Sequence, residues 1–157
     1  MGDFNADGRP DLVLLDYQEQ KTQAAVYYHT AEDRTPFPAR PSSRIDLQGK
    51  TADRHPLLRD APAVADWDGD GVDDLIVGKG QDRQILVLRG GREGLDLTRS
   101  LKIPLDYRLH YETGLYVGDF DGDRRPDIAT FGDTNTGVGA GGPPSVYLWI
   151  RADESRK

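Results

Sequence analysis

The chain has 157 residues, a formal net charge of −7 and no cysteine, and its length fits one domain with a core of its own. The lack of cysteine excludes disulfides and thiolate metal sites, and acidic residues without a basic stripe argue against a nucleic-acid partner. No apolar run reaches the length of a membrane-spanning helix, so membrane insertion is not expected.

The first predicted unit begins with an acidic loop. Residues 3–11 read DFNADGRPD, and the apolar run Leu12–Leu15 that follows predicts a short strand buried on both faces. The polar residues 16–21 predict a hairpin turn. Ala24–Tyr28 then forms the returning strand, and the alternating residues Arg44–Leu47 form a half-exposed outer strand.

The second predicted unit repeats this order with a more acidic loop. Residues 66–74 read DWDGDGVDD and lie between two expected strands, Ala61–Ala65 and Leu75–Val77. Ile85–Leu88 returns, and Leu97–Ile103 is the expected outer strand.

The third predicted unit has the same course. Gly114–Gly118 enters the loop at residues 119–127, which read DFDGDRRPD, and Ile128–Phe131 leaves it. Val146–Ile150 is the returning strand. No stretch has the period of an amphipathic helix.

These units predict an all-β fold of about three blade-like repeats, because a repeated four-stranded antiparallel unit is typical of β-propeller blades. The expected count is about ten strands in a partial propeller. The single segment divides into repeats over about residues 1–48, 60–104 and 112–151, followed by a frayed tail at 152–157.

The spacing within each nine-residue loop predicts a bound cation. Acidic or amide side chains at positions 1, 3, 5 and 9, with the backbone carbonyl of position 7, form an all-oxygen ligand set that suits Ca²⁺. Such crowded carboxylates repel one another without a cation, and three Ca²⁺ ions would bring the charge to about −1. The predicted ligands are Asp3, Asn5, Asp7, Arg9 (carbonyl) and Asp11; Asp66, Asp68, Asp70, Val72 (carbonyl) and Asp74; and Asp119, Asp121, Asp123, Arg125 (carbonyl) and Asp127.

The three sites are not expected to be equal. Position 6 needs a positive φ, which Gly71 supplies freely and Arg124 does not, at a cost of about 1 kcal/mol. Asn5 replaces a carboxylate in the first loop. We therefore expect the second site to bind most tightly and the third to be weakened.

The loops and strands resemble the FG-GAP repeats of integrin-α-type propellers and the related VCBS-type repeats. Gly118–Phe131 and Gly139–Trp149 follow the whole course of that motif, including Phe131-Gly132 and the Gly-Gly-Pro at 141–143. The resemblance implies Ca²⁺ in the blade hairpins of an extracellular, periplasmic or cell-surface protein, although Met1-Gly2 runs straight into the first loop without a signal peptide. It also implies a structural or recognition role, such as adhesion or binding of a glycan or an extracellular protein.

Propellers of that family close with more blades than this chain supplies. The resemblance therefore implies either a piece of a longer protein or self-association of two copies into a ring. Phe4, Trp67 and Phe120 recur at loop position 2 and are expected to anchor the core. Possible ligand contacts are Tyr27, Tyr28, Tyr107 and Tyr111.

Other functions are less well supported by the sequence. An EF-hand or dockerin loop needs glutamate at position 12 and flanking helices, but this position holds Leu14, Val77 or Thr130. The glycine run 137–142 precedes two prolines and no helix, so it predicts a turn and not a phosphate cradle.

An enzyme remains the alternative, as part of a calcium-dependent, polysaccharide lyase-like propeller. No Gly-x-Ser-x-Gly elbow is present. His110-Tyr111-Glu112 could transfer protons, although such a group is more often structural.

Overall fold

The computed structural model describes residues 1–18, 21–31, 35–47, 62–79, 84–105, 108–109, 115–133 and 145–149. Within this part of the chain every regular element is a strand, and no helix that could cross a membrane occurs. The described strands are β1 (Leu12–Gln18), β2 (Lys21–Tyr27), β3 (Ser43–Asp46), β4 (Ala63–Ala65), β5 (Asp74–Lys79), β6 (Gln84–Arg89), β7 (Asp96–Pro104), β8 (Arg108–Leu109), β9 (Leu115–Gly118), β10 (Asp127–Asp133) and β11 (Ser145–Trp149).

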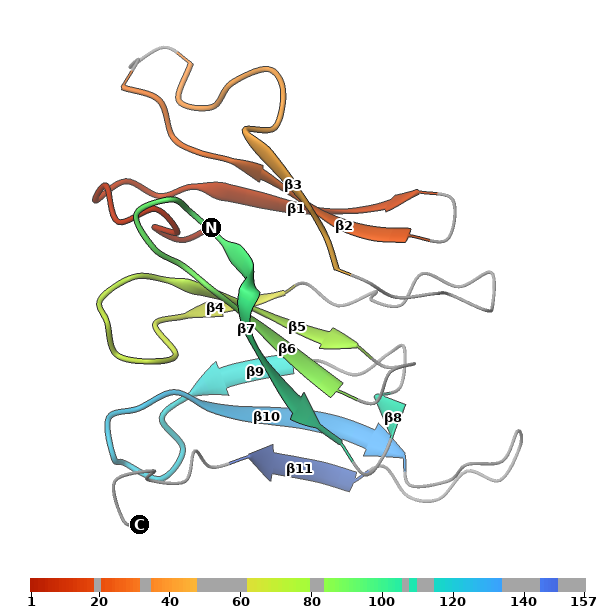
Figure 1. The fold of residues 1–157 in the computed structure, drawn as a ribbon. Helices are drawn as coiled ribbons and strands as arrows, with labels where there is room; N and C mark the ends of the chain where they lie inside the picture. The colour runs from red at the N-terminus through yellow and green to blue at the C-terminus, as the bar shows by residue number, and fades with distance from the viewer. Residues whose placement is uncertain are drawn as a thin grey trace.

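The strands form three antiparallel sheets stacked face to face (Figure 1). The first sheet has the order β1-β2-β3 and the second the order β4-β5-β6-β7. In the third sheet β11 pairs with one edge of β10, while β9 and β8 pair with successive parts of its other edge. The all-β prediction of about three blade-like units is therefore confirmed, with β8 as a strand that the sequence pattern did not predict.

The hairpin of the first sheet is longer than predicted. Residues 16–21 do not form one wide turn, since β1 continues to Gln18 and pairs there with Lys21 of β2. Asp16 tolerates its place in the strand because its carboxylate forms a 3.1 Å ion pair with Arg44 on β3. A polar residue can thus extend a strand whose face is partly open to water.

The first core fills the space between the first and second sheets. Side chains from β2 of the first sheet and from β5 and β6 of the second sheet meet there, and Phe4 joins them from the first acidic loop. The fully buried members of this cluster include Phe4, Ala24, Val26, Leu75, Val77 and Leu88.

The second core lies between the second and third sheets. Ile76, Ile85 and Val87 come from the other face of the second sheet, and Ile128 comes from the third. Trp67 joins this core from the second acidic loop. The second sheet is thus covered on both faces, as a middle layer must be.

The two outer faces of the stack differ from the predictions. Leu14 is 48 % exposed, so β1 is not buried on both faces. Phe120 is 49 % exposed and does not anchor a core, whereas Phe4 and Trp67 do, as predicted. The reason is the same in both cases, because no described sheet packs against these two outer faces.

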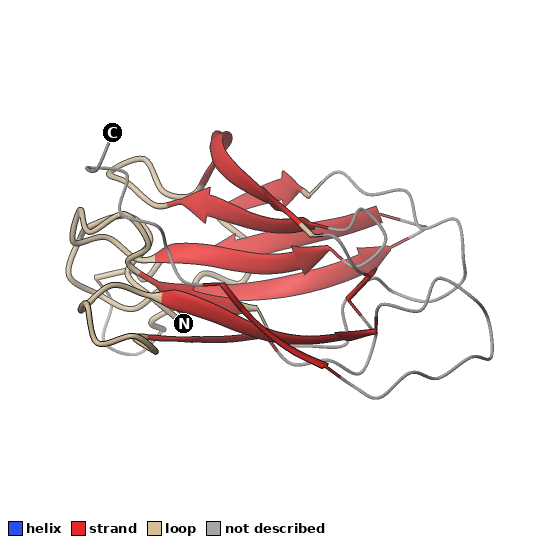
Figure 2. Ribbon diagram, turned by 90° about the horizontal axis from the view of Figure 1, so that it is seen from below, coloured by secondary structure: helices blue, strands red, loops and turns tan. Residues whose placement is uncertain are grey.

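The three acidic loops lie at the same end of the stack. Each one leads directly into the strand that follows it, namely β1, β5 or β10, and these strands point the same way in Figure 1. Figure 2 shows the corresponding connections gathered at one end of the strands. The fold thus places three equivalent loops side by side along one edge.

Candidate metal centre

The first aspartate of each loop holds the loop in shape by accepting backbone hydrogen bonds. Asp66 accepts N–H groups of Gly69, Asp70 and Gly71 at 2.8–3.0 Å. Asp3 accepts those of residues 7 and 8, and Asp119 those of residues 122 and 124, at 2.7–3.1 Å. Three different sequences therefore build the same turn.

Positions 3 and 5 continue this pattern. In the second loop, Asp68 Oδ1 accepts the N–H of Asp70 at 3.2 Å, and Asp70 Oδ1 accepts that of Val72 at 2.9 Å. The other two loops repeat both bonds, from Asn5 and Asp7 and from Asp121 and Asp123. These are the local turns that short acidic side chains favour.

Two positions in each loop have a left-handed backbone. Position 6 has φ values of 79° at Gly8, 85° at Gly71 and 70° at Arg124, as the sequence predicted. Position 4 is also left-handed, at Ala6, Gly69 and Gly122. The first and third loops thus each hold one strained non-glycine residue, and the second holds none.

The aspartate at position 9 is buried in all three loops, and in the first two it accepts hydrogen bonds on both oxygens. Asp74 Oδ2 accepts the N–H of Trp67 at 3.0 Å, and Oδ1 accepts that of Gly90, after β6, at 2.7 Å. Asp11 does the same with Phe4 and His29. This carboxylate therefore ties the loop to the end of the returning strand, a role beyond the predicted metal ligation.

Burial also changes the acidity of these groups. Loss of water raises the pKa of Asp74 and Asp11 above the ordinary value of 3.8, against the lowering effect of the N–H groups that they accept. A nearby cation would favour the ionised form of both carboxyls.

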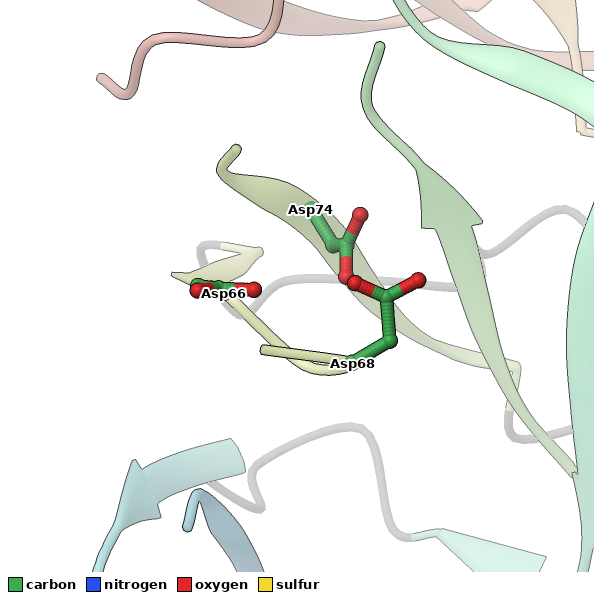
Figure 3. Close-up of side chains that lie close together, drawn as sticks. All are labelled: Asp66, Asp68 and Asp74. Carbon is green, nitrogen blue, oxygen red and sulfur yellow. The ribbon is translucent and has the colours of Figure 1, made fainter. Parts of the chain in front are cut away.

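The second and third loops each bring three carboxylates together. One oxygen from each of Asp66, Asp68 and Asp74 lies within 4.8 Å of the others, around the bend of the second loop (Figure 3). Asp119, Asp121 and Asp127 form the equivalent group in the third loop. Both triads could hold a metal ion, since hard cations take such oxygen ligands.

The remaining predicted ligands do not belong to these triads. Asp70 and Asp123 are not members of the carboxylate triads. The first loop keeps the same backbone course but has Asn5 where the others have an aspartate, so it offers two carboxylates and one amide at these positions. Ligation by the carbonyls of Arg9, Val72 and Arg125 remains a prediction.

Two arginines lie against the acidic loops. Arg89, from the end of β6, forms an ion pair with Asp68. Arg9 bonds Asp7 at 3.0 Å and lowers the pKa of that carboxyl. These side chains supply part of the positive charge that the loops attract.

Asp73 has a role that the acidic pattern concealed. Its carboxylate accepts the N–H of Asp3 at 2.8 Å, and its own N–H donates to the carbonyl of Asp3 at 3.0 Å. It therefore fastens the first loop to the second sheet. The sequence does distinguish this residue, because position 8 holds Asp73 in the second loop but Pro10 and Pro126 in the other two.

Several other sequence predictions concern residues outside or away from this site. Tyr28 packs against the first core and its hydroxyl accepts the N–H of Leu95 at 3.2 Å, so its contacts are internal. Tyr27 is half-buried. Tyr107, the group 110–112 and the glycine run 137–142 lie outside the described residues.

Comparison with known proteins agrees with the repeat pattern. A family model described as an FG-GAP-like repeat matches residues 3–77 and again residues 66–130. Each match extends from one acidic loop to the strand after the next loop, and together they include all three loops. No curated protein and no solved structure matches the chain.

Proposed function

Because the chain belongs to the FG-GAP-like repeat family, whose repeats form propeller blades, we propose that its acidic loops bind Ca²⁺ and lock the blade hairpins. The observation that carries this proposal is the carboxylate triad at positions 1, 3 and 9, which recurs with the same geometry in two successive repeats. In the first loop, position 3 is filled by the amide of Asn5, which also offers an oxygen.

The choice of Ca²⁺ over other ions follows from the ligand chemistry. All side chains at the loop positions offer oxygen, and the carbonyls at position 7 would complete the set without a rigid octahedron. We expect each site to bind Ca²⁺ with a modest affinity, a dissociation constant of about 10⁻⁴–10⁻³ M, as in extracellular modules. Such sites fill outside the cytoplasm, which supports a secreted, periplasmic or cell-surface protein.

The second site should bind most tightly. It has four carboxylates at the predicted ligand positions, and glycine at both left-handed positions. The ion pair between Arg89 and Asp68 opposes this advantage, since the ion and the guanidinium attract the same carboxylate. Asp70→Asn should therefore reduce total calcium binding more than Asp123→Asn.

The proposed biological role is recognition of a glycan or an extracellular protein on a rigid scaffold. A hollow of about 650 Å³ beside β3 and the connection from β6 to β7 supports it, because charged side chains of both signs line it. These include Arg44, Asp46, Arg92, Glu93, Asp96 and Arg99. A glycan array probed with the chain and with an Arg92→Ala variant would test this surface.

Calorimetric titration and thermal melting test the calcium sites. Ca²⁺ should raise the melting temperature relative to a chelated sample, and Mg²⁺ at the same concentration should do so less. Asp121→Asn should weaken binding at the third site, while Asp16→Asn, which lies outside the loops, should leave it unchanged. Equal melting temperatures in excess calcium and in chelator would refute the proposal.

A further inference from the structure

Exposed apolar side chains concentrate on the two outer faces of the stack. Among the described residues, the large hydrophobic side chains that stay exposed are Met1 (66 %), Tyr116 (56 %), Phe120 (49 %), Leu14 (48 %) and Leu101 (39 %). All except Leu101 lie on an outer face of the first or third sheet, as the equivalence of the repeats shows. Exposed apolar surface of this kind marks an interaction site.

One outer face belongs to the first sheet. In the second sheet, the first and third residues after the acidic loop, Leu75 and Val77, pack against the preceding sheet in the first core. Leu12 and Leu14 hold these positions in the first sheet, where no described sheet precedes them.

Met1 belongs to the same face. Gly2 pairs with Asp11 as Ala65 pairs with Asp74, so Met1 is the equivalent of Val64. Val64 packs against the first core, on the side of the preceding sheet. The outer face of the first sheet is thus equivalent to the face by which the second sheet packs against the first and the third sheet packs against the second.

The other outer face belongs to the third sheet. The aromatic residue at loop position 2 packs against the following sheet, as Phe4 does in the first core and Trp67 in the second. Phe120 has no following sheet in the described chain. Its ring lies over Gly118, where an added Cβ would be 3.4 Å from it.

Tyr116 shares this face. It pairs with Ala129, whereas its neighbours Leu115 and Val117 pack against the second core on the opposite side. Side chains alternate between the faces of a strand, so Tyr116 points away from that core.

We propose that a second copy of the chain covers these faces, with the Phe120 face of one copy docked on the Met1–Leu14 face of the next. Faces equivalent to these two already pack together twice within the chain, between the first and second sheets and between the second and third sheets. Pro10 at position 8 matches Pro126, so the new contact copies the junction between the second and third sheets. It goes beyond the proposed function and requires no bound ion.

This contact is heterologous, because the two copies contribute different surfaces. A repeated heterologous contact either closes into a ring or continues as an open chain of molecules. A ring of two copies would form this contact twice, about a two-fold axis, whereas a contact between two like faces is not expected.

Sedimentation of the full 157-residue chain over a range of concentrations tests the proposal. The unmodified chain should self-associate in chelator as well as in calcium. Phe120→Glu and Leu14→Glu should each weaken association by about 100-fold or more, because a charge would be buried in an apolar contact. Leu101→Glu, which changes an exposed leucine away from both faces, should associate like the unmodified chain.

Mixing the two variants gives the decisive measurement. Phe120→Glu retains an intact Met1–Leu14 face and Leu14→Glu retains an intact Phe120 face, so an equimolar mixture should form a complex with one copy of each. Misfolded variants could not restore binding in this way. The proposal is overturned if the unmodified chain stays monomeric at all concentrations, or if the mixture stays as weakly associated as the separate variants.

Discussion

The aspartate that ends the second acidic loop combines two roles at one residue. Asp74 accepts a backbone hydrogen bond on each oxygen and also belongs to a carboxylate triad. Its apolar surroundings at the start of β5 explain why it is buried, while Asp68 in the same triad lies at the surface. Substitutions can therefore separate the structural role from the metal role.

Asp74→Asn should destabilise the chain by about 1–3 kcal/mol even in chelator, since the amide turns an N–H group toward another N–H group. Asp121→Asn, at an exposed triad position, should change stability in chelator by less than about 0.5 kcal/mol. Urea unfolding of both variants checks this difference. Equal losses in chelator would contradict the structural role of Asp74.

Non-glycine residues with a left-handed backbone lower the stability of two loops, at Ala6 in the first and Arg124 in the third. Ala6→Gly and Arg124→Gly should each stabilise the chain by up to about 1 kcal/mol, because glycine adopts positive φ without the Cβ clash. Gly71→Ala should destabilise it by a similar amount. Denaturant unfolding measures all three, and a stabilising Gly71→Ala would contradict the explanation.

The strands and loops could be predicted from the sequence because each unit repeats the same local pattern. The apolar runs after the loops identified β1, β5 and β10, and the next apolar run in each unit identified β2, β6 and β11. β8 has only two residues and leaves no period to detect. The extent of β1 was underestimated because the ion pair of Asp16 with Arg44, 28 residues apart, is not a local signal.

At the junction between the first loop and the second sheet, the Asp73 carboxylate adds a side-chain hydrogen bond to the backbone bonds. Asp73→Ala removes the acceptor of the Asp3 N–H and should weaken this junction by about 1 kcal/mol. Effects in repeat proteins stay near the altered junction, so hydrogen exchange should accelerate in residues 3–11 and not in 119–127. Asp16→Ala, in the first sheet, is the control, and uniform acceleration across all three loops would count against a local clamp.

The whole chain carries a net charge of −7, much of it in the three loops. In chelator, the raised pKa of Asp11 and Asp74 means that their protonated forms favour folding below the ordinary value of 3.8, and that this contribution disappears as pH rises through the raised pKa. Binding of a cation requires the ionised forms, so it adds stability at higher pH.

The rise in melting temperature caused by Ca²⁺ should therefore shrink as the pH is lowered through the raised pKa of Asp11 and Asp74, at a higher pH than ordinary carboxyls would give. Melting temperatures in calcium and in chelator at each pH give this rise by subtraction. The chelated samples account for the effect of the other acidic residues on stability. A calcium effect independent of pH would contradict ligation by the buried aspartates.

At the scale of the molecule, the candidate site was predicted more completely than its surroundings. Loop spacing alone identified all six members of the two triads. It could not identify Asp73 as a clamp or Arg89 as a counter-ion, because both act across segments that only the folded chain brings together. The exposure of Phe120 was missed for a related reason, since the pattern shows which residues are anchors but not whether a neighbour is present.

The aromatic residue at loop position 2 has one further consequence. Phe4 is covalently part of the first repeat, but its ring is buried in the core that the first and second repeats share, and Trp67 lies in the core shared by the second and third. The repeats are therefore not interchangeable modules. A blade grafted into another protein must therefore be accompanied by the core residues of the next blade that surround its aromatic ring. Without them, the ring would not fit the new following blade, and the preceding blade's aromatic side chain would be missing from the core on the other side.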